Sequence, residues 1–182
     1  MNELKHDWFA VHTRHQHEGV VLSILALKGF HTFLPTYRDV RRWKDRKKVL
    51  ALPLFPGYVF TTEARERRLD VLSTPGVCGV LSVEGVPAKI PDDEMEVVIR
   101  MTSCPESLQP YPFIRQGDHV RVKSGPLAGI EGILVGEKDK FRLVVSIQMM
   151  GRSASVEIDR DLIDAVRSSA PPAIRSVQRL SA

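Results

Sequence analysis

The spacing of apolar residues changes partway along the chain and divides the sequence into two regions. In the first region, short apolar runs typical of buried strands alternate with segments whose apolar residues recur at helical spacing. The predicted strands lie at 8–11, 33–35, 49–52, 57–60, 77–83 and 87–90, and the predicted helices lie at 18–28, at 65–73 and from 92 onward. The first region is therefore predicted to be a domain that mixes strands with helices.

In the second region, apolar residues alternate with other residues at a period of two, as in a strand that has one buried face. The alternation is clearest between Phe141 and Ile147. Glycines punctuate the region at turn positions, namely Gly125, Gly129, Gly132 and Gly136. Several short strands separated by turn signals predict a small β-barrel. Gly132 stands among apolar residues, where a side chain would block the close packing of two backbone segments.

A proline-rich segment separates the two regions. From Cys104 to Phe113 the sequence is CPESLQPYPF, and its three prolines neither continue a helix nor fit inside a sheet. This segment is the best candidate for an interdomain linker. The predicted organisation is an N-terminal domain over 1–104, a linker over 105–115, a barrel over 116–167 and a flexible tail over 168–182.

A strongly basic segment lies between two predicted strands of the first region. Residues 38–48, RDVRRWKDRKK, carry seven basic side chains and two acidic ones, so they have little to bury and are predicted to form an exposed hairpin arm. Arginine and lysine contact phosphates without reading sequence, and tryptophan can stack on a base. The candidate nucleic-acid-binding residues are Arg41, Arg42, Trp43, Lys44, Arg46, Lys47 and Lys48. The alternative is a solvated loop.

Composition narrows the remaining possibilities. The net charge of +4 and the pI of about 9.2 are mildly basic and indicate a polyanionic partner only weakly. Cys78 and Cys104 have neither zinc-site spacing nor a disulfide framework, so both are predicted to be reduced thiols of a cytoplasmic protein. The N-terminus lacks the apolar run of a signal peptide, and no apolar stretch approaches the ~20 residues of a membrane span.

The sequence carries no motif for catalysis. It has no glycine-rich phosphate loop, no G-x-S-x-G turn and no paired metal ligands. The acidic cluster at 92–94 stands at a predicted helix start, where the helix dipole favours acidic groups without a catalytic role. His15 and His17 have no cysteine or carboxylate at ligand spacing. We therefore expect no enzymatic activity, no cofactor and no metal site.

Four segments resemble parts of one known family. The segment GDHVRVKSGPLAGIEGILVGEKDKFRLVVSI, residues 117–147, resembles the KOW motif, an SH3-like barrel shared by NusG-type factors and several ribosomal proteins. The segment LPLFPGYVF, residues 52–60, together with WFAV at 8–11 and TPGV at 74–77, resembles the NusG N-terminal domain. The order of these elements agrees over nearly the whole chain, so the sequence as a whole resembles the NusG family.

The resemblance implies an α+β fold, with an antiparallel sheet and flanking helices in the first domain. It also implies that this domain binds the clamp helices of the largest RNA polymerase subunit through a hydrophobic depression. Phe55 and Tyr58 are then the leading contacts, and Leu54 and Pro56 shape the pocket. Aromatic anchors on a proline-stiffened segment lose little entropy on binding. The core of this domain is expected to contain Trp8, Val59 and Phe60.

The resemblance further implies contacts with DNA and with a second protein. In the family the hairpin tip lies towards upstream DNA, and in RfaH-type relatives the loop before the first helix contacts the non-template strand. The matching residues here are Arg14, His15 and His17. Those relatives carry a basic residue where Pro75 stands here, so a polar loop that leads into the helix remains an alternative. The loop of the barrel that would meet a ribosomal protein or Rho contains Met149, Met150 and Arg152, with methionines in place of the usual aromatic residue.

Two functional hypotheses follow from the sequence. The first is a monomeric transcription elongation or antitermination factor, closest in type to the specialised UpxY and RfaH groups. Its barrel is not expected to refold into helices, because strand-forming alternation and turn glycines make a poor helical sequence. The alternative is a KOW-type RNA-binding or ribosome-associated protein that does not bind polymerase.

Overall fold

The computed structural model describes residues 7–43, 46–105, 107–111, 118–137 and 140–166. The chain divides into two compact units. The first contains the described residues up to Leu34 and those from Phe55 to Met95, and the second contains Pro35–Leu54 and the described residues from Glu96 onward. The predicted tail over 168–182 and the predicted contact Lys44 lie outside the described residues.

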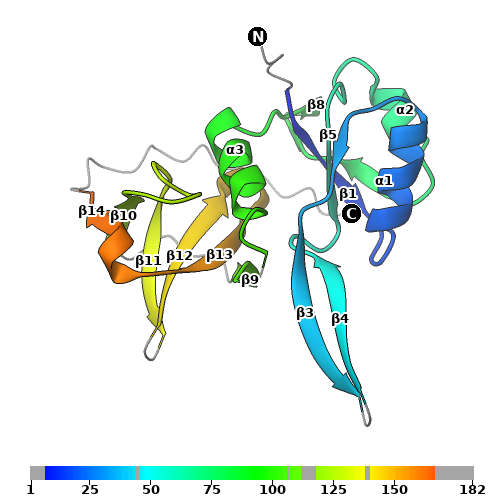
Figure 1. Ribbon diagram of the computed structural model, residues 1–182. Helices are drawn as coiled ribbons and strands as arrows, with labels where there is room; N and C mark the ends of the chain where they lie inside the picture. Colours follow the sequence, from blue (N-terminus) through cyan, green and yellow to red (C-terminus); the bar gives the residue numbers. More distant parts are fainter. Residues whose placement is uncertain (1–6, 44–45, 106, 112–117, 138–139, 167–182) are drawn as a thin grey trace. The chain divides into compact units, whose positions relative to one another are not determined.

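The first unit contains a four-stranded antiparallel sheet with the order β2-β5-β1-β6 (Figure 1). Its strands are β1 (Phe9–Thr13), β2 (Thr32–Phe33), β5 (Tyr58–Thr61) and β6 (Val77–Val80). The unit also contains the helices α1 (Glu18–Leu27) and α2 (Arg68–Leu72) and a small hairpin of β7 (Ser82–Val83) and β8 (Val86–Pro87). This antiparallel sheet with helices confirms the predicted α+β class.

One apolar cluster connects the sheet of the first unit to its helices. The members of this cluster are Phe9, Val11, Val21, Leu25, Phe30, Val59, Ala64 and Val71. Val59 and Phe60 are fully buried, which confirms their prediction as core residues. Trp8 is only half-buried, beside the rings of His31 and Phe33, so its assignment to the core is corrected.

Helix α1 follows from the local sequence. An acidic residue, Glu18, stands in its first turn, where the helix dipole favours negative charge. Val21 and Leu25 lie one turn apart and point into the apolar cluster. Gly29 ends the helix with φ +84, a left-handed conformation that glycine adopts without steric cost.

The basic arm in the second unit is a long antiparallel hairpin of β3 (Thr36–Trp43) and β4 (Arg46–Pro53), visible in Figure 1. The hairpin predicted over 38–48 therefore begins earlier, at Thr36, and ends later, at Pro53. Val40 and Val49 are directly opposed across the two strands, and both are exposed.

The rest of the second unit is built on a six-stranded antiparallel sheet with the order β14-β10-β11-β12-β13-β9. Its strands are β9 (Gln109–Tyr111), β10 (Asp118–Val122), β11 (Glu131–Glu137), β12 (Lys140–Ile147), β13 (Arg152–Ile158) and β14 (Ile163–Ala165). Two short 3-10 helices, η1 (Gln148–Met150) and η2 (Arg160–Leu162), join the later strands.

Gly132 allows two strands of this sheet to approach closely. A Cβ atom at this position would lie 2.7 Å from the carbonyl oxygen of Val144 and 2.9 Å from Cδ1 of Leu143. Side chains cannot tolerate such distances to backbone, so the position requires glycine, as the sequence predicted.

The range predicted as the linker contains a strand. Gln109–Tyr111 forms β9 and pairs with β13, and Leu108 just before it is buried. The buried guanidinium of Arg142 donates hydrogen bonds to the carbonyl oxygen of Ser107 at 3.0 Å and to Oγ of Ser155 at 2.9 Å. Because Pro110 lies at the edge of the sheet, its missing N–H removes no bond that a central strand would need.

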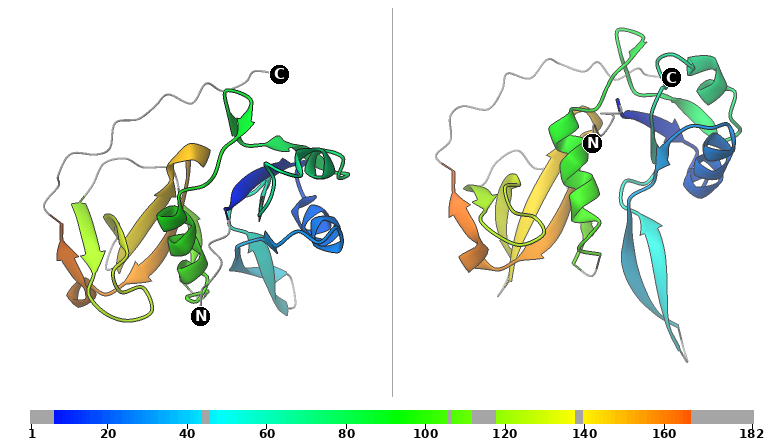
Figure 2. Two further views of the ribbon diagram at one scale, coloured as in Figure 1. Left: turned by 90° about the horizontal axis from the view of Figure 1, so that it is seen from above. Right: turned by 45° about the horizontal axis from the view of Figure 1, so that its top comes forward.

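Helix α3 (Asp92–Met101) begins in the first unit and ends in the second. Nη2 of Arg100 donates hydrogen bonds to the carbonyl oxygens of Pro126 at 2.9 Å and Ala128 at 2.6 Å. The second half of α3, in green, accordingly lies beside the six-stranded sheet in both views of Figure 2.

Candidate functional site

The segment Phe55–Tyr58 forms a tight turn that leads into β5. The backbone N–H of Tyr58 donates to the carbonyl oxygen of Phe55 at 3.1 Å, and Gly57 has φ +83. Proline at the second position and a glycine of positive φ at the third are the signature of a type II turn. Pro56 is exposed and Tyr58 is half-buried, so this turn presents an aromatic ring and a proline ring to solvent.

The turn is attached on both sides of Gly57. Its N–H donates to Oε1 of Glu18 at 2.7 Å, and its carbonyl oxygen accepts from the N–H of Thr13 at 2.8 Å. Helix α1 and strand β1 therefore both hold the turn. The hydrogen bonds leave the glycine little freedom to change its conformation.

Phe55 does not lie at the surface as the sequence predicted. Its side chain is 2% exposed and packs edge-on against Phe60, with ring centroids 6.0 Å apart at an interplanar angle of 79°. Leu54, the residue before the turn, is 1% exposed. The expectation that Phe55 contacts a partner directly is therefore corrected for the free protein. Phe55 supports the turn from beneath, because it belongs to the same aromatic packing as the strand residue Phe60.

His12 joins the exposed side of the turn and was not among the residues predicted for the site. It lies opposite Tyr58 in the ladder between β1 and β5, and the two ring centroids are 5.3 Å apart. Its side chain is exposed, whereas Phe9, Val11 and Thr13 on the same strand are buried. A polar residue inside an apolar strand was the only available signal. We call Pro56, Tyr58 and His12 the docking surface.

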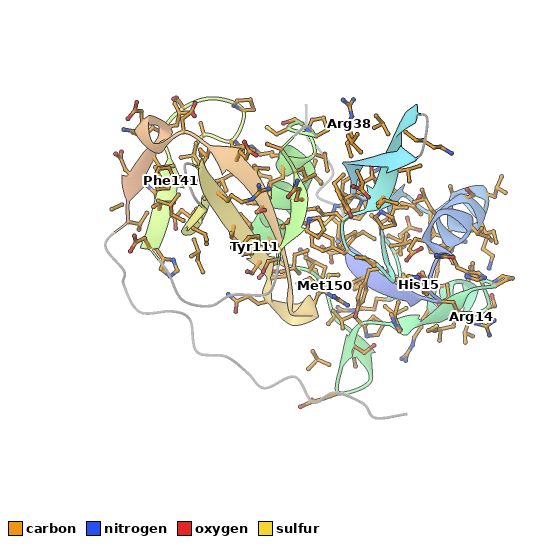
Figure 3. All side chains as sticks on the ribbon, turned by 90° about the horizontal axis from the view of Figure 1, so that it is seen from below. Arg14, His15, Arg38, Tyr111, Phe141 and Met150 are labelled. Carbon is orange, nitrogen blue, oxygen red and sulfur yellow. The ribbon has the colours of Figure 1, made fainter. Side chains whose placement is uncertain are left out.

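The predicted nucleic-acid loop, Arg14–His17, lies next to the docking surface in the same unit. Arg14, His15 and His17 are all exposed, and Figure 3 shows Arg14 and His15 together where β1 ends. The N–H of Arg14 donates to the carbonyl oxygen of Gly76 at 2.8 Å. Nδ1 of His17 lies 3.0 Å from the carbonyl oxygen of His15. The loop therefore has a defined shape and presents three basic or titratable side chains on one edge of the unit.

Gly76 brings the TPGV turn against this loop. It has φ +93, and a Cβ atom there would lie 3.3 Å from Cβ of His17 and 3.1 Å from Cγ2 of Val21. Both the conformation and the space therefore favour glycine. Pro75, which stands where specialised relatives carry a basic residue, is exposed beside it.

The register of the basic arm places basic residues directly opposite each other at two of its three outermost pairs. Arg41 pairs with Lys48, Arg42 with Lys47, and Trp43 with Arg46. Like charges at directly opposed positions destabilise a strand pair. Lys48 is exposed, whereas the side chains of Arg41–Trp43 and Arg46–Lys47 lie outside the described part of the structure.

The predicted contact loop of the second unit is only partly exposed. Met150, labelled in Figure 3, is 8% exposed, so its assignment to an interface is corrected. It ends η1, and Gly151 then reverses the chain with φ +58, which leaves Met150 on the inner side. Arg152 is exposed, and the side chain of Met149 lies outside the described residues.

The described residues contain neither a group of side chains suited to a metal ion nor a helix suited to crossing a membrane. Within these ranges, no three His, Cys, Asp or Glu side chains are grouped so that they could hold a metal ion. None of the helices in the described ranges combines the length and apolar character that a membrane crossing requires. Cys78 and Cys104 are both free thiols.

Comparisons with known proteins place the chain in one family. The family model described as transcription termination factor nusG matches residues 6–99. The transcription termination/antitermination protein NusG of Staphylococcus carnosus (strain TM300) is 30% identical over 172 residues, which cover 86% of this chain and 94% of that protein. The protein of the same name from Staphylococcus aureus (strain Mu50 / ATCC 700699) is 28% identical with the same coverage.

A solved structure agrees with the fold. A structure of NusG from Thermotoga maritima is 24% identical, covers 91% of this chain and 100% of that chain, and superposes with a TM-score of 0.53. The family model over residues 6–99 and the relative at 30% identity show that the chain belongs to the NusG family.

Proposed function

We propose that this chain is a transcription elongation or antitermination factor that binds RNA polymerase through its first unit. The observation that carries the proposal is the docking surface, in which an exposed Pro56 and a half-buried Tyr58 lie on a turn held from two sides. Family membership supports it, because the staphylococcal relatives are named as transcription termination/antitermination proteins. The chain would act in the cytoplasm as a monomer and would have no catalytic role.

The partner of the docking surface is the clamp-helix region of the largest polymerase subunit. A tyrosine and a proline on a preformed turn lose little conformational entropy when they bind an apolar helix pair. Tyrosine is also among the residues that most often dominate binding energy at interfaces. Phe55 and Leu54 are buried, so they would contribute by supporting the turn and not by contacting the partner directly.

Nucleic acid is the second partner in this proposal. Arg14, His15 and His17 would approach the non-template strand, and the arm β3–β4 would approach upstream DNA. The support is the exposure of the three loop side chains and the opposed like charges of the arm. Contacts of this kind attract phosphates without reading sequence.

The second unit would recruit a further protein, such as a ribosomal protein or Rho. The exposed Arg152 supports this role, and the burial of Met150 narrows the proposed contact to Arg152 and Met149. A KOW domain over 116–167, joined through 105–115 to a polymerase-binding domain over 1–104, would hold that partner at raised effective concentration.

We further propose a specialised, operon-specific role of the UpxY and RfaH type. The motivation is the RRWKDRKK arm, the segment LPLFPGYVF and the altered barrel loop with its two methionines. Chromatin immunoprecipitation tests this point. Occupancy restricted to a few operons supports it, whereas uniform occupancy across all genes contradicts it.

The direct test of polymerase binding is co-purification with native RNA polymerase. We expect the wild-type chain to co-elute and Tyr58→Ala to weaken the affinity by about 10- to 100-fold, as for a central aromatic contact. Leu69→Ala is the matched control, because Leu69 is an exposed apolar residue on α2 outside the docking surface. If Tyr58→Ala binds as well as the wild type, polymerase docking fails and the RNA-binding or ribosome-associated alternative gains.

A further inference from the structure

Glu18 carries a nearly fully buried carboxylate in the first turn of a helix, although both of its chain neighbours are exposed. It stands in the first turn of α1, and its neighbours His17 and Gly19 are both exposed, yet its own exposure is 4%. Burying a charged group is costly unless hydrogen bonds compensate for the lost water. The compensating bond here comes from the backbone N–H of Gly57, 2.7 Å from Oε1.

This bond reaches a backbone site that is intrinsically mobile. Gly57 has φ +83, and glycine samples a wider range of conformations than any other residue. The carboxylate of Glu18 holds its N–H, and the N–H of Thr13 holds its carbonyl oxygen at 2.8 Å. The residues on either side of Gly57 are Pro56 and Tyr58, so these two bonds fix the orientation of both.

We infer that Glu18 is a positioning residue for partner binding, whose carboxylate holds the turn at Gly57 in the conformation that presents Pro56 and Tyr58. The inference rests on the proposed docking function. Glu18 touches no partner itself. It acts by keeping the docking surface in its binding conformation before the partner arrives, which lowers the entropy that binding must remove.

Glu18 also connects two of the proposed contact regions. It directly follows the loop Arg14–His17, and its side chain reaches the turn 39 residues later. Loss of the bond would leave the N–H of Gly57 without its acceptor in a part-buried setting, and the turn would gain alternative conformations. The docking surface would then move independently of the loop.

Substitutions of Glu18 distinguish the effect of its hydrogen-bond acceptor from the effect of its negative charge. Glu18→Gln keeps an oxygen at the same reach and loses the charge. Glu18→Asp keeps the charge, but it is one methylene shorter and cannot reach Gly57 from the same backbone. Glu18→Ala removes both. Glu63→Ala is a matched control, because Glu63 is an exposed acidic residue that pairs with Arg67, four residues later, and not with the turn at Gly57.

The affinity of the full chain for purified RNA polymerase tests the inference. We expect Glu18→Ala and Glu18→Asp to bind about tenfold more weakly, Glu18→Gln to bind within about threefold of the wild type, and Glu63→Ala to bind unchanged. Rescue by glutamine and not by aspartate identifies the acceptor oxygen at Gly57 as the cause. Wild-type affinity of Glu18→Ala overturns the inference, and so does an equal loss for glutamine and alanine.

Tyr58→Ala, measured beside these variants, separates this inference from the proposed function. If Tyr58→Ala weakens binding and Glu18→Ala does not, docking stands and the role of Glu18 is wrong. If neither variant weakens binding, the docking function itself fails, and the inference fails with it.

Hydrogen exchange of the Gly57 amide supplies a second readout that needs no partner. We expect this amide to be protected in the wild type and in Glu18→Gln and to exchange faster in Glu18→Asp. The amide of Val59, two residues later in β5, should keep its protection in all three. Equal protection of Gly57 in the wild type and in Glu18→Asp overturns the inference. This comparison remains available if Glu18→Ala does not fold.

Discussion

The turn at Phe55–Tyr58 and the basic arm have opposite physical character. In the turn, the local choices agree: Pro56 and Gly57 suit its type, and Glu18 satisfies the N–H that the turn points inward. In the arm, the local choices conflict, since Arg41 is opposed by Lys48 and Arg42 by Lys47. If the proposed function holds, the turn needs little rearrangement to bind its partner, whereas the arm gains a counter-charge only when a polyanion binds.

This difference assigns different contributions to the two segments. A preorganised, largely uncharged contact gives specificity and depends weakly on salt. A cluster of cations gives affinity for phosphates that falls steeply as salt rises, because bound counterions are released. Natural proteins break local rules mainly at functional sites, so the conflict in the arm is itself a sign of function.

The largest expected effect comes from breaking the agreement within the turn. Gly57→Ala places a side chain at φ +83, a conformation strained for any residue with a Cβ atom. We expect the affinity for polymerase to fall by more than tenfold and the free energy of unfolding to fall by about 1–2 kcal/mol. Binding assays and urea denaturation measure the two quantities. An unchanged affinity would show that the turn need not be rigid.

A smaller effect is expected from removing charge at the arm. For Lys47→Ala/Lys48→Ala, we expect duplex DNA binding to weaken several-fold at low salt and the slope of log affinity against log salt to shrink by about 1.8, as for two lost phosphate contacts. The affinity for polymerase in high salt should not change. Fluorescence anisotropy over a salt series measures the slope. An identical slope for variant and wild type would remove the arm from the nucleic-acid interface.

The smallest expected effect is a gain in stability when one of the opposed basic residues of the arm is replaced by an acidic one. Lys48→Glu replaces a like-charge pair with Arg41 by an opposite-charge pair. We expect the free energy of unfolding to rise by about 0.2–1 kcal/mol while DNA binding weakens. Urea denaturation at low salt measures the gain, and the gain should shrink as salt is added. A loss of stability would show that the opposed cations do not repel one another in the free protein.

Local periodicity predicted the α+β class and most elements, because it reports the geometry of the backbone within a few residues. The period of two around Leu143 and the helical spacing around Val21 both match elements of the structure. The strand within the proline-rich segment was harder to predict. Its strand β9 exists through pairing with β13, which lies more than 40 residues later in the chain.

Exposure of single side chains could not be predicted in the same way. Phe55 and Met150 were both predicted to be exposed contact residues, yet both are buried. The exposure of a side chain depends on the tertiary packing around it, which the local sequence pattern does not show. Phe55 packs against Phe60, and Met150 is turned inward by the chain reversal at Gly151. The role inferred for Glu18 likewise depends on a partner 39 residues away, which no local pattern shows.

Site-specific photo-crosslinking from position 58 tests the central proposal most directly. A photoreactive amino acid replaces Tyr58 in one variant and Leu69 on α2 in the control, and each is irradiated with native RNA polymerase. We expect a crosslink from position 58 to the clamp helices of the largest subunit and no crosslink to that region from position 69. No crosslink to the largest subunit from position 58, or equal crosslinking from both positions, would contradict it.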